Sequence, residues 1–356
     1  MASYRLLKRK WYLFALPVVI AILLLLILIG VQHIEQGYTG VALMHIAGSF
    51  SVDTPESLKQ AASEGVGTIF YYGQPPSGNS ALGQKLLALH MQVVDGFIGS
   101  YLYYYECHRT KTVKPPPWGD SAYCVTDSHP ELSSEDAVLA VIAAHLQQVR
   151  NNDLVVGYWV LDDWVPWDTG SARGLLIKVH NLIQHYTPGR PAICGFGGFL
   201  GKSSAGGADY GWLDGLADNF SAQGCDMVGL YIYTPALAVN LPASYYDWSM
   251  AKVLPAVFTS LEKRGWNSVR EPLIGIAQAF GGPRRNTDLY WAIPDADDIV
   301  TQSKSFCKHG ATGIVYYGWD DSTFGPGMQT PVNNTGIDRG IQEGIAACKQ
   351  IWGYSP

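Results

Sequence analysis

Two adjacent acids, Asp162 and Asp163, end the apolar segment GYWVLDDW, which runs from Gly157 to Trp164. Two carboxylates at the end of a buried strand are unfavourable unless they face a polar cavity. Neighbouring strand residues point to opposite faces, so one acid is expected to face that cavity while the other hydrogen-bonds its neighbours. Apolar surroundings and a second carboxylate both favour a protonated carboxyl group. Asp163, with Asp162, Trp159 and Trp164 beside it, is therefore the expected general acid.

A structural role for the same two acids stays open. They could cap the helix expected to begin near residue 171, because helix N-termini favour acidic and hydroxyl side chains. Asp168 and Ser171 are better placed for that capping role. Asp162 and Asp163 thus remain the first candidates for chemistry.

A second acidic pair, Asp320 and Asp321, follows the apolar segment 312–319. Either carboxylate could be the base that activates water, provided that it lies across the same cavity from Asp163. Trp319, directly before the pair, offers a flat ring on which a sugar can stack. The alternative is that Trp319 fills the top of the core, with the two acids solvated beside it.

Residues at the ends of other apolar segments are expected to bind a substrate together with Trp164 and Trp319. They are His45, Tyr72, Tyr231, Tyr233 and Gln278. Tyr231 and Tyr233 are two residues apart and share one face of a strand. The amide of Gln278 needs hydrogen-bond partners inside an apolar segment. A structural role for His45 is the alternative and the commoner one for a lone histidine.

Eight apolar segments alternate with helical patterns and are expected to be strands. They are 39–48, 66–73, 92–99, 154–164, 190–198, 226–235, 271–282 and 312–322. Near-continuous hydrophobicity indicates parallel strands that are covered on both faces. Eight strand–helix units predict a (β/α)8 barrel, in which residues that follow the strands meet at one mouth. A doubly wound open sheet is the competitor, but no Gly-rich phosphate turn follows the first segment.

The helical patterns begin and end at recognisable residues. In 51–65, Asp53 or Thr54 can cap the helix and Gly65 can end it. In 133–153, Ser133 and Asp136 have the spacing of a capping box. Four more amphipathic patterns follow at 171–186, 249–265, 295–310 and 336–353. Two insertions, 100–133 and 199–222, follow the third and fifth strands and are expected on the side of the mouth.

The N-terminal segment predicts a membrane anchor. Residues 11–31 are uncharged and long enough to cross a bilayer as a transmembrane helix. The basic tail 1–10 is expected to stay in the cytoplasm, which places the linker 32–38 and the barrel domain 39–356 outside. A cleaved signal peptide is the alternative, and in either case the barrel is exported.

Composition and motifs exclude several partners. Beyond the basic N-terminal tail, the chain has 20 basic against 30 acidic residues, which disfavours nucleic acid as a partner. No metal-binding motif, phosphate loop or nucleophile elbow is present, so no metal and no other cofactor is expected. The many Trp and Tyr residues combine a flat apolar ring with a polar group, which suits carbohydrate.

Six cysteines in an exported chain permit disulfides, although their spacing does not choose between the possible connectivities. Cys107 and Cys124 bracket a Pro-rich loop and could form a local crosslink. Cys307 and Cys348 lie on the last two expected helices, which are adjacent in a barrel.

Several segments from the fourth to the eighth strand resemble those of uncharacterised clan-A-type glycoside-hydrolase barrels. GYWVLDDW is similar to a G-Y-x-x-x-D-E-P pattern of that family, and TPGRPAICGF is similar to the lead into its fifth strand. DMVGLYIYTP, PLIGIAQAFGG and GIVYYGWDD are similar to its last three strands. The resemblance implies a (β/α)8 fold and hydrolysis of glycosidic bonds.

The chain departs from the family pattern at four positions. Asp163 stands in place of Glu, Trp164 in place of Pro, and Tyr231 in place of Asp. Gln278 lies where retaining members of the family have a nucleophilic Glu. A retaining mechanism needs two closely spaced carboxyl groups, whereas an inverting one places water between them. The resemblance therefore implies that a retaining mechanism would lack its nucleophile.

Three functions follow from these observations. The first is a membrane-anchored glycoside hydrolase that acts on a polysaccharide or a cell-envelope glycan, with Asp163 as the acid and Asp320 or Asp321 as the base. The second is a carbohydrate-binding barrel without catalysis, which Gln278 favours. The third is a structural surface protein that docks a partner through loop 100–133.

Overall fold

The computed structural model describes most of the chain beyond residue 44. The described residues are 45–52, 54–110, 129, 132–162, 171–197, 200–202, 208–209, 214, 217–233, 246–247, 249–283, 290–320 and 325–354, with side chains left out at 107–110, 171, 200–202, 208–209 and 246–247. They belong to one compact unit, Ala42–Pro356. Three of the expected site residues, Asp163, Trp164 and Asp321, lie outside the described residues.

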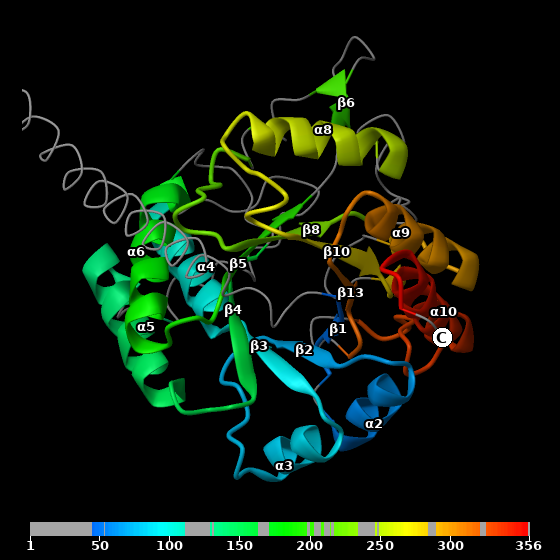
Figure 1. Ribbon diagram of the computed structural model, residues 1–356, viewed down its shortest axis with the longest axis horizontal. Helices are drawn as coiled ribbons and strands as arrows, with labels where there is room; N and C mark the ends of the chain where they lie inside the picture. Colours follow the sequence, from blue (N-terminus) through cyan, green and yellow to red (C-terminus); the bar gives the residue numbers. More distant parts are fainter. Residues whose placement is uncertain are drawn as a thin grey trace, which may run out of the picture. The chain divides into compact units, whose positions relative to one another are not determined.

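Eight parallel strands close into a barrel in the order β1-β13-β10-β8-β5-β4-β3-β2 (Figure 1). They are β1 (Ile46–Phe50), β2 (Thr68–Tyr71), β3 (Gln92–Asp95), β4 (Val155–Leu161), β5 (Ala192–Gly197), β8 (Met227–Tyr231), β10 (Leu273–Gln278) and β13 (Gly313–Tyr317). Each falls within or overlaps one of the eight predicted strands. The predicted (β/α)8 barrel is confirmed.

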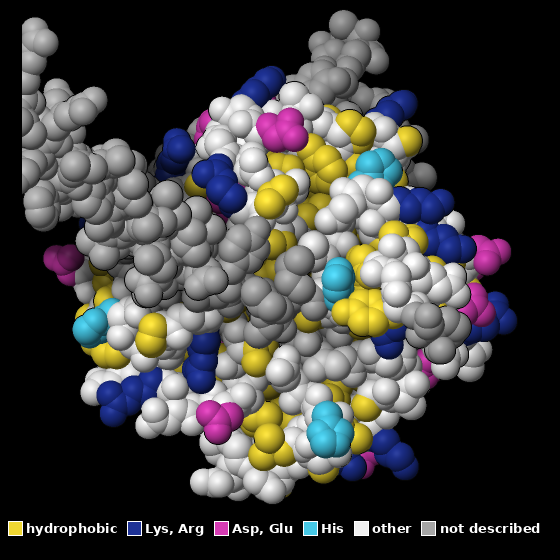
Figure 2. Space-filling view, in the orientation of Figure 1, with side chains coloured by type: hydrophobic (Ala, Val, Ile, Leu, Met, Phe, Trp, Pro, Cys, Tyr) yellow, Lys and Arg dark blue, Asp and Glu magenta, His cyan; other side chains and the backbone are white. Residues whose placement is uncertain are grey.

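Helices surround the barrel in Figure 1. They are α2 (Pro55–Ser63), α3 (Ala81–Ala88), α4 (Phe97–Thr110), α5 (Glu135–Val149), α6 (Ser171–Tyr186), α8 (Met250–Glu262), α9 (Ala296–Lys308) and α10 (Thr335–Ile351). Figure 2 shows Lys and Arg side chains dispersed around the periphery of this face, over the outer elements. None of the helices in the described ranges is both long enough and apolar enough to span a bilayer, and the predicted anchor at 11–31 lies outside those ranges.

Short antiparallel strands lie in the connections that follow β5, β8 and β10. One pair consists of β11 (Gly282–Pro283) and β12 (Tyr290–Trp291). A three-stranded group consists of β6 (Leu200–Lys202), β7 (Ala208–Asp209) and β9 (Tyr246–Asp247), with β6 in the centre. β6 and β7 fall within the predicted insertion 199–222.

The structure confirms one predicted helix cap, moves another by one residue and extends a helix into a predicted insertion. Thr54 caps α2, and its Oγ1 accepts a hydrogen bond from the Ser57 backbone N–H at 3.1 Å. The cap of α5 is Ser134, one residue later than expected, because the helix begins at Glu135 and the Ser134 Oγ accepts from the Ala137 N–H. The prediction that 100–133 begins as a loop was wrong, because its first residues belong to α4.

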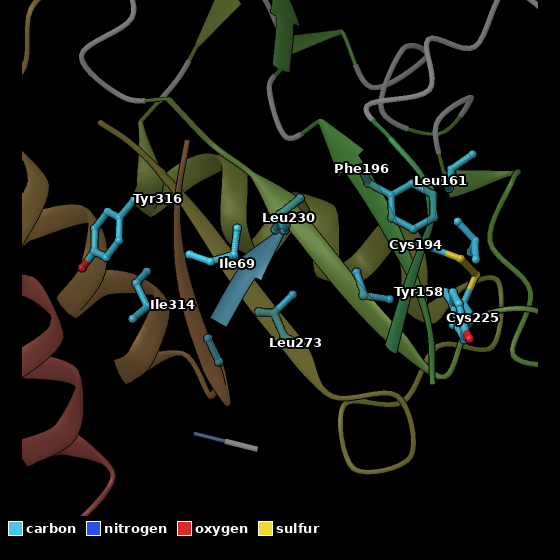
Figure 3. Packing of buried hydrophobic residues seen from close by; sticks show 14 of the residues in the cluster. Ile69, Tyr158, Leu161, Cys194, Phe196, Cys225, Leu230, Leu273, Ile314 and Tyr316 are labelled. Atoms are coloured by element: carbon cyan, nitrogen blue, oxygen red, sulfur yellow. A yellow bond between two sulfur atoms is a disulfide. The ribbon is translucent and has the colours of Figure 1, made fainter. Parts of the chain in front are cut away.

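Apolar side chains fill both faces of the barrel wall. Inside the barrel lie Ile46, Phe50, Phe70, Val94, Trp159, Ile193, Met227, Tyr231, Ile274, Ile276 and Val315. Alternate strand residues, such as Ile69, Leu230 and Ile314, pack outward against the helices (Figure 3). Burial on both faces explains the near-continuous hydrophobicity of the strands.

Two disulfides tie neighbouring elements together. Cys194–Cys225 joins β5 to the segment before β8, with Cα atoms 5.6 Å apart (Figure 3). Cys307–Cys348 joins α9 to α10, with Cα atoms 5.5 Å apart, as their places on the last two predicted helices suggested. The side chains of Cys107 and Cys124 lie outside the described part of the chain.

Replacing Cys307 and Cys348 together by Ala is expected to lower the free energy of unfolding by about 2–4 kcal/mol, because this crosslink restricts the unfolded chain. Urea denaturation of the variant and of the oxidised wild type measures the difference. Equal free energies of unfolding would contradict a stabilising role for this disulfide. The matched pair Cys194→Ala/Cys225→Ala reports on the other crosslink in the same assay.

Candidate functional site

A bulge in β4 turns Asp162 into the barrel. Trp159 pairs with Ile193 of β5, but Leu161 pairs with the very next residue, Cys194, so two residues of β4 oppose one of β5. Val160 and Leu161 consequently both pack in the outer core, while Trp159 lies inside. Strict alternation from Trp159 would have brought Asp163 to the inner face. A bulge re-aims the residues that follow it.

Side chains from three strand ends hold one carboxylate oxygen of Asp162. Its Oδ1 accepts hydrogen bonds from the Tyr231 hydroxyl at 2.7 Å, the Trp159 Nε1–H at 3.0 Å and the Tyr72 hydroxyl at 3.4 Å. The Tyr72 and Tyr231 hydroxyls are also 3.4 Å apart. Hydrogen bonds donated to a carboxylate favour its charged form. Asp162 is thus a partly buried carboxyl group in the barrel mouth, and three side-chain donors contact its Oδ1.

Aromatic rings surround this carboxylate. Phe50 stacks on Tyr72 with ring centroids 5.3 Å apart, and Tyr233 stacks on Tyr317 at 6.2 Å. Tyr231 connects these two ring pairs, because its ring centroid lies 5.9 Å from that of Phe50 and 5.8 Å from that of Tyr233. Phe50 and Tyr231 are buried, whereas Tyr72, Tyr233 and Tyr317 are partly exposed. The five rings, called the aromatic cup below, form a surface suited to the apolar face of a sugar.

The aromatic cup continues toward the connection after β10. Phe280, Trp291 and Met328 form a small buried cluster against which Tyr233 and Tyr317 pack. Phe50 and Tyr317 were not among the predicted site residues. Tyr317 could have been found, because alternation along β13 places it on the inner face with Val315.

Burial and the charge of Asp162 act together on Tyr231. Burial is the larger cause and the Asp162 carboxylate the next, and together with Tyr72 and Tyr233 they raise the pKa of Tyr231 well above 10.0. The ionised phenolate would be both desolvated and repelled by the nearby anion. Tyr231 therefore remains a neutral hydrogen-bond donor to Asp162 at physiological pH.

Two predicted substrate-binding residues do not line this mouth. The strand expected at 39–48 begins instead at Ile46, so His45 precedes β1 and lies at the opposite end of the barrel. Its Nδ1 is 3.1 Å from the Tyr354 hydroxyl, and its ring packs beside Trp352. Trp319 is fully buried in the outer core and offers no platform to a ligand. Neither side chain therefore lines the surface of the mouth.

Gln278 ends β10 with its side chain fully buried. Its Nε2 donates to the backbone carbonyls of Phe280 at 2.8 Å and Ala292 at 2.9 Å. Gln302 accepts a hydrogen bond from the Gln278 backbone N–H at 3.2 Å. The N–H groups of this amide thus tie the connection 280–292 to the barrel instead of reaching a ligand. Its Oε1 has no hydrogen-bond partner among the described residues.

Asp320 follows β13 and is exposed, and its backbone N–H donates to the Ser51 carbonyl at 3.0 Å.

No three His, Cys, Asp or Glu side chains of the described residues lie close enough together to hold a metal ion.

Comparisons with known proteins show the fold of the chain. No protein-family model matches the sequence, and no curated protein does. Among solved structures, the endo-beta-1,4-mannanase from Thermotoga petrophila is similar with a TM-score of 0.53 and 11% identity, over 87% of this chain and 78% of that one. The endo-1,4-beta-mannanase from Rhizomucor miehei is similar with a TM-score of 0.52 and 10% identity, over 86% and 95%. The chain therefore shares the (β/α)8 barrel fold of these two solved structures.

Tyr231→Phe is expected to change how stability depends on alkaline pH. Above about pH 10 the unfolded chain releases the Tyr231 proton while the folded protein keeps it, so wild-type stability falls as the pH rises. Tyr231→Phe has no phenol to titrate at this position, so its free energy of unfolding should fall less steeply with pH. At pH 8 this free energy should already be lower than in the wild type, because the hydrogen bond to the Asp162 carboxyl group is lost. Urea denaturation between pH 8 and 11 measures both effects. If the free energies of unfolding of wild type and variant fell in parallel with rising pH, the raised pKa of Tyr231 would be contradicted. Tyr290→Phe, at an exposed ring, is the control.

Proposed function

We propose that this protein binds a glycan in the mouth of its barrel and hydrolyses a glycosidic bond there. The observation that carries the proposal is the Asp162 carboxylate, which lies inside the mouth with its Oδ1 held by Tyr231 and Trp159. The partly exposed rings of Tyr72, Tyr233 and Tyr317 lie beside or near it. An anion among rings suits a neutral sugar whose ring gains positive charge as the bond breaks.

The two acids of β4 take different parts in this proposal. Asp162, charged and held by three donors, stabilises positive charge on the sugar. Asp163 follows it directly and is the general acid that protonates the leaving oxygen. A nearby anion makes a second carboxyl group keep its proton, and acid catalysis needs such a difference between neighbouring carboxyls.

An inverting mechanism fits the residues around the mouth better than a retaining one. At the end of β10, where a retaining enzyme of the resembled family has its nucleophile, stands Gln278, whose amide N–H groups are used within the protein. In the inverting mechanism water is the nucleophile, and a base activates it. Asp320, exposed after β13, and its neighbour Asp321 are the proposed bases.

Export and anchoring belong to the same proposal. The two disulfides of the described residues form and persist in oxidising compartments. An uncharged segment at 11–31, preceded by basic residues, would hold the barrel at the outer face of a membrane. The substrate would then be a polysaccharide or a glycan of the cell envelope.

Asp163→Asn is expected to lower kcat by about 10²- to 10⁴-fold, because the amide cannot donate the proton that the leaving oxygen needs. Reducing-end release from a panel of soluble polysaccharides, including β-1,4-mannan, measures the activity. Asp162→Asn should lose activity as well, since its charge disappears. Asp153→Asn is the matched control, because Asp153 is exposed near the opposite end of the same strand. Full activity in Asp163→Asn, with wild-type circular dichroism, would contradict this assignment.

A non-catalytic carbohydrate-binding barrel is the second candidate. Gln278 favours it, because this residue stands at the end of β10, where retaining enzymes of the resembled family have a nucleophilic Glu. Such a protein would bind oligosaccharides through the aromatic cup without releasing product. Isothermal calorimetry on the wild type, run beside the reducing-end assay, separates the two candidates. Tyr317→Ala should weaken binding in either case, because the ring surface is lost.

A further inference from the structure

Trp159 lies across two glycines on neighbouring strands. Gly195 of β5 and Gly229 of β8 are directly opposite each other in the register of the barrel. A Cβ atom built on Gly195 would lie 2.2 Å from Trp159 Cζ2, and one built on Gly229 would lie 2.4 Å from Cη2. Real Cβ contacts are never so short. The benzene part of the indole therefore occupies the space that two side chains would otherwise fill.

Three aromatic rings also pack against the indole. Phe50, Phe70 and Tyr231 meet it edge to face, with centroids 5.4, 5.6 and 5.9 Å away. The Trp159 side chain is only 1% exposed. A packed interior offers such a ring no other place to move. Displacing it from the glycines thus requires a shift toward residues of the aromatic cup.

The same indole carries a donor to the candidate anion. Trp159 Nε1–H donates to Asp162 Oδ1 at 3.0 Å. The indole is rigid beyond two side-chain torsions, so the place of its benzene part fixes the place of its N–H. The absence of a Cβ at Gly195 and Gly229 thereby determines where one donor to the carboxylate lies.

We propose that Gly195 and Gly229 are positioning residues of the active site: by leaving room for the indole of Trp159, they hold the Nε1–H against Asp162 and so orient the carboxylate toward the sugar. This inference rests on the proposed function for its effect on turnover, but not for its effect on the Trp159–Asp162 hydrogen bond. Supporting residues of this kind matter because a misplacement of about 1 Å can reduce a rate by about 10²-fold.

The test compares Gly195→Ala and Gly229→Ala with Gly275→Ala. Gly275 of β10 is a matched control, because its Cβ would meet Phe306 at 2.3 Å in the outer core, away from Asp162. The Trp159 indole N–H is followed by ¹⁵N–¹H NMR, with its resonance assigned from Trp159→Phe. In Gly195→Ala and Gly229→Ala we expect this resonance to shift and its hydrogen exchange to become at least about tenfold faster, and kcat to fall at least about tenfold with KM little changed. Gly275→Ala should lower the melting temperature but leave the resonance, its exchange rate and kcat as in the wild type.

A double variant keeps the test decisive if the single variants fold poorly. Trp159→Phe removes the ring atoms that collide with a Cβ at residue 229. Gly229→Ala/Trp159→Phe is therefore expected to melt at a higher temperature than Gly229→Ala while its kcat stays at the level of Trp159→Phe.

Three outcomes would overturn the inference. They are an unmoved indole resonance in both Gly195→Ala and Gly229→Ala, an equal disturbance of it in Gly275→Ala, and wild-type kcat in the double variant. If the wild type hydrolyses no glycan, the proposed function fails, and the indole resonance still decides whether the glycines position the donor to Asp162.

Discussion

The bulge between Trp159 and Leu161 sets the geometry of the candidate site, because it decides which residues of β4 face the barrel interior. Without it, the inner face would continue from Trp159 to Leu161 and Asp163, and Asp162 would point toward the helices. With it, Trp159 and Asp162 lie on the same inner face and are joined by the Nε1–Oδ1 hydrogen bond. Tyr231 from β8, two strands away from β4, then completes the support of the carboxylate.

Aliphatic side chains, the Trp159 indole and the aromatic cup together fill the interior of the barrel. Aliphatic residues such as Ile193, Met227 and Ile274 fill part of the interior. The indole of Trp159 lies against the glycine pair Gly195 and Gly229, and the aromatic cup surrounds Asp162. Large rings fit in a barrel only where other strands supply little or no side chain, so the glycines and the rings depend on each other. The same packing that stabilises the fold thus places the polar group.

Periodicity and composition were sufficient to predict the barrel, because parallel strands buried on both faces leave a clear hydrophobic signal. They were also sufficient to direct attention to the end of β4. That Asp162 faces the barrel interior could not be predicted from the sequence, since a bulge is a tertiary feature that alternation does not reveal. His45 was misplaced because the first strand begins later than its apolar residues suggested.

The roles of Trp319 and Gln278 show a second limit. Each residue type is compatible with sugar binding, and only the packed structure shows that Trp319 faces the helices and that Gln278 holds a connection. Tyr317 and Trp319 are two residues apart and would share one face of a regular strand. β13 ends at Tyr317, however, so alternation no longer holds for Trp319, which packs in the outer core.

A crystal structure of the Asp163→Asn variant soaked with an oligosaccharide would show directly whether a glycan binds beside Asp162. We expect a sugar ring on the partly exposed rings of Tyr72, Tyr233 and Tyr317, with the cleavable bond beside Asp162. An oligosaccharide bound elsewhere on the protein, with the mouth of the barrel filled by water alone, would contradict it.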